Sequence, residues 1–130
     1  MNARASAAAT TTALVLAGLA PLAAADGDAA TGRKVFTACI NCHAVGPSAR
    51  HGFGPQLNAL VGRKADTSPG YAYSAGMKAS GLVWSEATLT AFLRDPGAVV
   101  PGTKMRFWGV GMNEGKVRDL LAYLAAAQDR

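Results

Sequence analysis

The chain has 130 residues, a length that suits one domain rather than two. Its formal charge of +5 is modest, and no basic run is interleaved with aromatic side chains, so we expect no nucleic-acid partner. Its two cysteines are too few for the disulfide framework on which many small exported domains depend.

The first residues have the layout of a secretory signal peptide. An apolar run follows a positive charge at Arg4, and it ends in small residues at Ala25. The alternative is an uncleaved membrane anchor, but a span needs about 20 apolar residues, and this run is shorter and contains Pro21. We therefore predict a signal peptide over 1–25, cleaved after Ala25, an exported domain over 26–130, and no stable membrane insertion.

The first half of the exported domain predicts one helix followed by long loops. Asp28 is a suitable cap for a helix that runs to about Cys39. Paired glycines and prolines then mark most of 44–83 as loop, with short helical turns expected near 57–61 and 74–79.

The second half predicts two further helices. Ser85 is a suitable cap for the first, which the Asp-Pro pair at 95–96 stops. A glycine-rich loop over 97–111 follows, and Asn113 begins a last helix that ends around Ala127. No alternating strand pattern of useful length exists, so the fold is expected to be all-α. Loops of this length need something large among them to hold them in place.

Residues 39–43 read Cys-Ile-Asn-Cys-His and contain both cysteines of the chain. Two thiols three residues apart can each add to one vinyl group of the same haem. The imidazole of the next residue then lies under the ring and reaches the iron. The motif therefore predicts one covalently bound haem c, held by Cys39, Cys42 and His43.

Three other interpretations of these residues are weaker. A thioredoxin-type redox pair requires a βαβ setting, whereas helix and loop surround this motif. A zinc site needs four ligands, which His51 could complete, but such a structural site rarely dominates an exported chain of this size. A local disulfide would leave His43 unexplained.

A sixth iron ligand is sought among Met77, Met105, Met112 and His51. Met105 differs from the other methionines because it follows residues 100–104, a constrained loop that contains proline and glycine. Such a loop can aim a thioether at a metal from the side opposite a histidine. A thioether is a soft, weak donor that favours ferrous iron and raises the reduction potential.

Over nearly all of 26–130 the chain resembles the class I cytochromes c, specifically the short bacterial cytochrome c2 type, which is close kin of mitochondrial cytochrome c. The resemblance implies an all-α class I fold, with three main helices, short helices and long loops wrapped around one haem. Besides the haem motif, the matching positions are Gly27, Asp28, Gly32, Phe36, Gly54, Pro55, Leu57, 62–64, 69–71, Tyr73, Trp84, 101–105 and 120–124.

The resemblance assigns the axial ligands and their supports. His43 matches the proximal ligand and Met105 the distal one, with Thr103 flanking the methionine. Pro55 matches the residue whose carbonyl accepts a hydrogen bond from the proximal imidazole, which fixes the ring and its tautomer. His51 matches a loop histidine that bonds backbone, which argues against its being a ligand.

The resemblance also assigns haem contacts and a helix contact. Arg63, Tyr73 and Trp84 match residues that bond a haem propionate, whose burial without donors would be costly. The contact between the first and last helices is matched by Gly32, Phe36, Leu120 and Tyr123.

Two positions on the methionine side depart from the family pattern. Phe92 stands where many relatives have a tyrosine that hydrogen-bonds near the methionine sulfur, and Met77 stands where many have an asparagine. The loss of both polar partners predicts a drier distal pocket and an altered reduction potential.

The charge around the expected haem edge also differs from the family pattern. Relatives often place a ring of lysines there, and this chain keeps Lys34, Lys104 and Arg106. Weakened steering predicts an association rate with little salt dependence and a more apolar docking surface. The ring positions that have lost their charge are Ala38, Gly97, Ala98, Gly111 and Met112.

Together these features predict a monomeric, soluble, periplasmic carrier of single electrons that is not an enzyme. Expected donors are a cytochrome bc complex or a dehydrogenase, and expected acceptors are an oxidase, a peroxidase or a photosynthetic reaction centre. One alternative is an enzyme or gas sensor with an open iron site, which requires that Met105 not bind iron. Another is the haem subunit of a larger periplasmic oxidoreductase.

Overall fold

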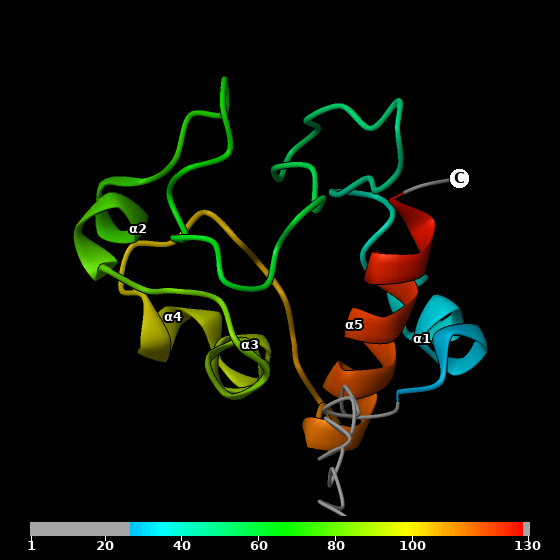
Figure 1. The fold of residues 1–130 in the computed structure, drawn as a ribbon. Coiled ribbons are helices and arrows are strands. Elements are labelled where there is room, and N and C mark those ends of the chain that lie inside the picture. The colour runs from blue at the N-terminus through cyan, green and yellow to red at the C-terminus, as the bar shows by residue number, and fades with distance from the viewer. Residues whose placement is uncertain (1–26, 129–130) are drawn as a thin grey trace, which may run out of the picture.

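The computed structural model describes residues 27–128, so the predicted signal peptide over 1–25 lies outside the described residues. Within that range the regular structure is helical, apart from one isolated antiparallel bridge between Lys64 and Val83. No described helix is long and apolar enough to cross a membrane. The helices are α1 (Ala29–Phe36), α2 (Ala75–Ser80), α3 (Glu86–Arg94), α4 (Pro96–Val99) and α5 (Glu114–Ala127) (Figure 1).

Helices α1 and α5 cross in close contact (Figure 1). Gly32 allows this approach, because a Cβ atom at that position would overlap the backbone oxygen of Asp119. The rings of Phe36 and Tyr123 pack beside the crossing with their centroids 5.3 Å apart. Leu120 of α5, which the family resemblance assigns to this contact, is buried.

The predicted caps are present at the three longest helices. The Asp28 side chain accepts a hydrogen bond from the Thr31 amide at the start of α1. Ser85 forms a capping box with Thr88 at the start of α3. Asn113 accepts from an amide in the first turn of α5, which ends at Ala127 as expected.

Two boundaries differ from the sequence prediction. Helix α1 ends at Phe36 rather than near Cys39, because the amides of residues 37–39 bond carbonyls three positions back and tighten the chain into turns. The loop expected over 97–111 begins with helix α4 instead. Pro96 cannot continue α3, but its fixed φ suits a first helical turn, and Asp95 caps that turn.

The two predicted short turns have different outcomes. The one near 74–79 is helix α2, capped by Ser74. Residues 57–61 form turns without a helix, which corrects the prediction there. Ala59 has a positive φ of 50°, a conformation that interrupts a right-handed helix, and its amide is bonded by the side chain of Gln128.

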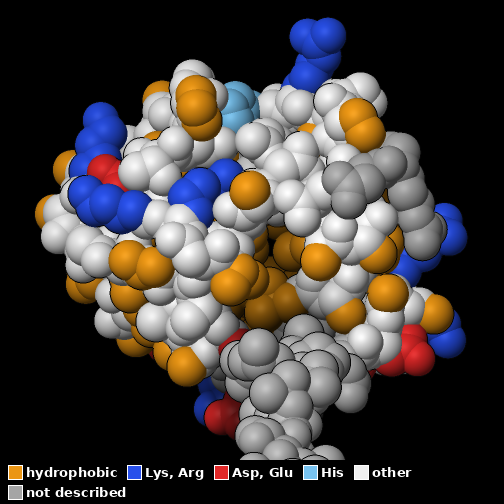
Figure 2. Space-filling view, viewed as in Figure 1, with side chains coloured by type: hydrophobic (Ala, Val, Ile, Leu, Met, Phe, Trp, Pro, Cys, Tyr) orange, Lys and Arg blue, Asp and Glu red, His pale blue; other side chains and the backbone are white. Residues whose placement is uncertain are grey.

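The molecule has two helical parts joined by loops. In Figure 1, α1 and α5 lie on one side, while α2, α3 and α4 lie on the other. The segment between α4 and α5 runs between these parts. Figure 2 shows a hollow with hydrophobic side chains on its walls between the two parts. Most buried apolar side chains therefore surround a cavity rather than a solid core.

Candidate haem site

A cavity of about 360 Å³ lies between the two helical parts. This volume falls within the roughly 300–1,000 Å³ typical of sites for cofactors and other small molecules. Every site residue predicted from the sequence lines it: Cys39, Cys42, His43, Pro55, Arg63, Tyr73, Trp84, Thr103 and Met105.

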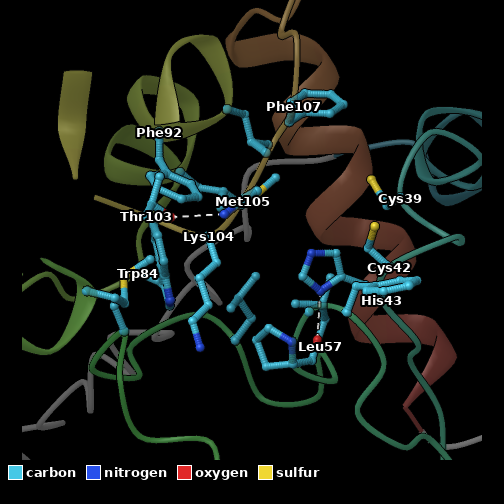
Figure 3. Close-up of a pocket in the computed structure, with 18 of the residues that line it drawn as sticks. Cys39, Cys42, His43, Leu57, Trp84, Phe92, Thr103, Lys104, Met105 and Phe107 are labelled. Atoms are coloured by element: carbon cyan, nitrogen blue, oxygen red, sulfur yellow. Dashed lines mark hydrogen bonds between the residues drawn. The ribbon is translucent and has the colours of Figure 1, made fainter. Parts of the chain in front are cut away.

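The motif residues occupy one wall of the cavity (Figure 3). Their placement follows from a tight turn, in which the amides of Cys42 and His43 both bond the carbonyl of Cys39 at 3.1 and 2.9 Å. Both cysteines are free thiols. Burial raises the pKa of Cys39 to about 11, and the neighbouring Cys42 adds to the shift. The turn thus presents two thiols and an imidazole to the same space.

The imidazole of His43 is fixed by its surroundings. Its Nδ1 lies 2.7 Å from the carbonyl oxygen of Pro55, and because a carbonyl only accepts, Nδ1 carries the hydrogen. Burial lowers the pKa of His43, while the Pro55 bond opposes that shift. Gly54 packs against the ring so closely that a Cβ atom would overlap it. The neutral ring therefore has Nε2 available as a metal donor.

His51 has both ring nitrogens engaged with backbone. Its Nε2 lies 2.8 Å from the carbonyl oxygen of Pro69, and its Nδ1 accepts from the Gln56 amide at 3.1 Å. The backbone bonding expected for this loop histidine is therefore present. This arrangement leaves no nitrogen lone pair for a zinc ion or for haem iron.

Met105 lies across the cavity from His43 (Figure 3). Its loop is held from two sides. The Lys104 ammonium donates to the carbonyl of Ala72 at 2.7 Å, and the Met105 amide bonds the buried Thr103 hydroxyl at 3.3 Å. Close packing of Gly76 in α2 against the Pro101 carbonyl supports the same loop. The thioether is thereby presented from a fixed backbone.

Polar groups gather at another part of the wall. Arg63 donates through Nη1 to the Asn58 carbonyl at 2.8 Å, but its Nε is buried without a partner among residues 27–128. The Tyr73 hydroxyl accepts from the Ser68 amide at 3.2 Å, and Trp84 is buried beside them on the cavity wall. A buried donor without a partner is costly. A carboxylate inside the cavity would satisfy it.

The remaining wall near Met105 is apolar. Phe92 is 3 % exposed and packs on Trp84, with ring centroids 5.1 Å apart, and Met77 is buried on the same cavity. The two departures from the family pattern therefore both face the site. Thr103, whose hydroxyl bonds the Met105 amide, contributes a polar side chain to the same cavity.

Two aromatic wall residues received no site role from the sequence, although Tyr71 is among the positions that carry the resemblance. Phe53 and Tyr71 line the cavity, and the Tyr71 hydroxyl donates to the Phe53 carbonyl at 2.5 Å. Tyr71 also packs edge-on against Tyr73, with centroids 4.8 Å apart. Phe53 directly precedes the Gly-Pro pair at 54–55, and this place in the sequence could have indicated that Phe53 lies at the cavity wall.

These observations fit a haem of the c type. Two thiols on one wall suit its vinyl groups, a neutral imidazole and a thioether on opposite sides suit its iron, and an unpartnered guanidinium nitrogen suits a propionate. The fold and the site together define the class as a small all-α haem protein with covalent attachment.

The comparisons agree with this class. Residues 29–128 match the family model for cytochrome c, and the chain belongs to the cytochrome c family. Cytochrome c2 of Blastochloris viridis is 48 % identical over 111 residues, which cover 85 % of each chain. Cytochrome c2 of Rhodomicrobium vannielii is 50 % identical over 101 residues, covering 78 % of this chain and 80 % of that one.

A solved structure also resembles the fold. Cytochrome cH from Methylobacterium extorquens superposes with a TM-score of 0.67 at 46 % identity, over 75 % of this chain and 97 % of that one. The predicted class I fold is thereby confirmed. The chain carries one covalently attached haem c, and it is an electron-transfer protein rather than an enzyme. Its partners are redox proteins.

Proposed function

We propose that residues 26–130 form a periplasmic cytochrome domain, exported by a signal peptide over 1–25 that is cleaved after Ala25. In this domain Cys39 and Cys42 would hold the haem, and His43 and Met105 would supply the protein ligands of its iron. The placement of His43 and Met105 on opposite sides of one apolar cavity carries this proposal.

Haem iron supplies a one-electron couple between Fe(II) and Fe(III). The protein keeps the surroundings of that couple constant. Pro55 fixes the orientation of the His43 ring, and the loop bonds of Thr103 and Lys104 fix the position of Met105. Two protein ligands leave no place for substrate on the iron, and rigid ligands keep the reorganisation on electron transfer small. These properties suit a carrier.

The polar cluster would bind a propionate. Arg63 has a free buried Nε, while Tyr73 and Trp84 bring a hydroxyl and an indole N–H to the same wall. Pairing the carboxylate with these donors would compensate for its removal from water.

The proposed donors are a cytochrome bc complex or a periplasmic dehydrogenase, and the proposed acceptors are an oxidase, a peroxidase or a photosynthetic reaction centre. Relatives named cytochrome c2 support redox-protein partners, and the net charge of +4 over 26–130 (12 Lys and Arg less 8 Asp and Glu) supports partners that carry negative charge. Because few lysines remain near the expected haem edge, the association rate should depend only weakly on salt. A steep loss of rate between low and physiological salt would contradict this part of the proposal.

Visible spectra of the reduced and oxidised protein test the function directly. We expect the spectrum of a low-spin covalent haem, with the weak absorption band at the red edge that marks methionine bound to Fe(III). Carbon monoxide binding distinguishes the electron carrier from the alternative, an enzyme or gas sensor. If the reduced protein readily bound carbon monoxide at neutral pH, the iron would have an open coordination site. The remaining alternative is that the protein is the haem subunit of a larger oxidoreductase. Purification at native abundance tests it, because a second subunit would then co-purify with the protein.

A further inference from the structure

The loop that follows Met105 presents two large apolar side chains to solvent. Trp108 is 90 % exposed and Val110 is 92 % exposed. Neither residue lines the cavity, so their exposure does not depend on what the cavity holds. Single exposed apolar residues are common, but a tryptophan and a valine displayed together in one turn form a feature that needs a reason.

This turn is held firmly against the end of α3. Gly109 packs so closely on the carbonyl of Leu93 that a Cβ atom would overlap it. The Arg94 side chain donates to the Met112 carbonyl at 3.2 Å, and the Met112 amide bonds the Gly109 carbonyl at 3.0 Å. A fixed turn loses little conformational entropy when a partner binds it. The two side chains are therefore displayed in a position suited to contact.

The exposed pair begins at the rim of the haem cavity. Met105, Arg106 and Phe107 all line the cavity, and Trp108 is the next residue along the chain. Figure 3 shows Phe107 beside Met105 at this end of the cavity. A protein seated on Trp108 and Val110 would therefore also cover the edge of the site through which electrons leave.

The charge of the loop indicates what kind of surface fits it. From Pro96 to Asn113 the chain has two cations, Lys104 and Arg106, and no carboxylate. An apolar pair bordered by positive charge is complementary to an apolar recess bordered by carboxylates. A second copy of this chain would instead bring like charges together.

We propose that Trp108 and Val110 anchor the docking of a redox-partner protein, by entering an apolar recess that acidic side chains surround. This inference rests on the proposed function as an electron carrier. Tryptophan is enriched among the few residues that dominate binding energy at interfaces. Arg106 and Lys104 would supply the weak steering, and the apolar pair would determine how long the complex lasts.

The test measures electron transfer between the haem-loaded protein and purified cytochrome bc complex, terminal oxidase, peroxidase, dehydrogenase and reaction centre, each over a range of salt. For Trp108→Ala/Val110→Ala we expect kcat/KM to fall at least about tenfold with a partner that the wild type uses, mainly through KM. For Trp108→Phe we expect a smaller fall in kcat/KM. Reduction potential, visible spectra and the rate with ferricyanide should match wild type.

Two controls separate this effect from others. Val61 is 59 % exposed and does not line the haem cavity, so Val61→Ala should leave kcat/KM unchanged. Arg106→Gln should flatten the salt dependence, whereas the double variant should keep the wild-type salt slope because it removes no charge.

Three results would overturn the inference. Rates of the double variant within twofold of wild type for every partner would show that the pair does not dock. A wild-type dimer in sedimentation equilibrium that the double variant abolishes, with partner rates unchanged, would assign the pair to self-association. If the wild type exchanges electrons with ferricyanide but with none of the complexes, the proposed partners and this inference fail together.

Discussion

The Nδ1 atom of His43 lies 2.7 Å from the carbonyl oxygen of Pro55, and Gly54 forms the floor beneath the same ring. Residues 54–55 therefore fix the imidazole from two directions. A hydrogen bond to the far nitrogen makes the near one a better donor to a metal. With His43 as the proposed ligand, the Gly-Pro pair would therefore set how strongly the imidazole donates to the iron.

Gly54→Ala should displace the His43 ring, because the added Cβ overlaps ring atoms. We expect the free energy of unfolding to fall by about 1–3 kcal/mol, as for overpacked sites. The reduction potential should rise, since a ring that has lost its Pro55 bond donates less to ferric iron. Spectroelectrochemistry and thermal unfolding measure both effects.

Gly97→Ala is the matched control for that substitution. A Cβ atom at Gly97 would lie 3.7 Å from its nearest neighbour, a side-chain oxygen of Asp95, which is an ordinary contact. This variant should keep the wild-type potential. If Gly54→Ala and Gly97→Ala had the same reduction potential and the same free energy of unfolding, Gly54 would not position the ring.

Met105→Ala should remove the red-edge band of the oxidised protein and let carbon monoxide bind the reduced form readily. Met77→Ala should keep the band, because Met77 lies on α2 and Met105 lies on the loop opposite His43. Absorption spectra of both variants decide the assignment. Survival of the band in Met105→Ala would transfer the ligand role to Met77.

Much of this arrangement could be predicted from local sequence. Asp28, Ser85 and Asn113 begin their helices because a cap needs only a side-chain oxygen within reach of an amide two or three residues on. The haem motif is equally local, since its chemistry depends on five consecutive residues. Such features need no knowledge of the rest of the fold.

Other features depend on contacts that sequence patterns do not reveal. The positive φ of Ala59 accompanies a hydrogen bond that its amide donates to the side-chain oxygen of Gln128, just after α5, so the failure of a helix there is a tertiary effect. Helix α4 was missed because Pro96 can stop one helix and start another. The free Nε of Arg63 is visible only once neighbouring residues have enclosed it.

Arg63→Leu should destabilise the haem-loaded protein by about 3 kcal/mol, because it leaves a buried propionate without its cation. The reduction potential should fall, since losing a positive charge near the iron favours the ferric state. Denaturant unfolding and redox titration measure these changes. Arg50, which is exposed, provides the control substitution Arg50→Leu.

The opposite sign of the stability change would contradict the propionate role of Arg63. The buried Nε has no partner within the described protein, so removing it would then relieve a cost and raise stability.

Asp28 should make the stability of α1 depend on pH. The Asp28 carboxylate accepts a hydrogen bond from the Thr31 amide, and this bond is the largest cause that holds the pKa of Asp28 below its ordinary value of 3.8. Since the folded protein prefers the charged form, the resulting stability is fully present above 3.8 and is lost as pH falls through the folded pKa. Asp28→Asn keeps a capping oxygen but has no charge to lose.

The melting temperatures of wild type and Asp28→Asn should therefore differ at neutral pH and converge in acid. Thermal unfolding across this range measures the difference. A gap that stays constant with pH would show that the carboxylate charge contributes nothing at this helix end.

Phe92→Tyr tests whether the distal wall is as apolar as its residues indicate. Phe92 is 3 % exposed, and its ring packs on Trp84. A hydroxyl added there has no evident partner, so we expect the free energy of unfolding to fall by about 1–3 kcal/mol. The reduction potential should also change, because a dipole enters the surroundings of the iron. An unchanged potential would contradict the idea of an unusually dry distal pocket.

Adding Met77→Asn to Phe92→Tyr should recover part of that loss. Both residues line the cavity, and the pair restores the polar partners that the family resemblance places at these positions. Each single variant adds one polar group to the cavity wall, whereas the double variant supplies both members of the polar network that the resemblance places there. Unfolding of all four proteins in a double-mutant cycle measures the coupling. Additive losses would mean that the two positions do not communicate, and that each apolar residue acts on the haem surroundings separately.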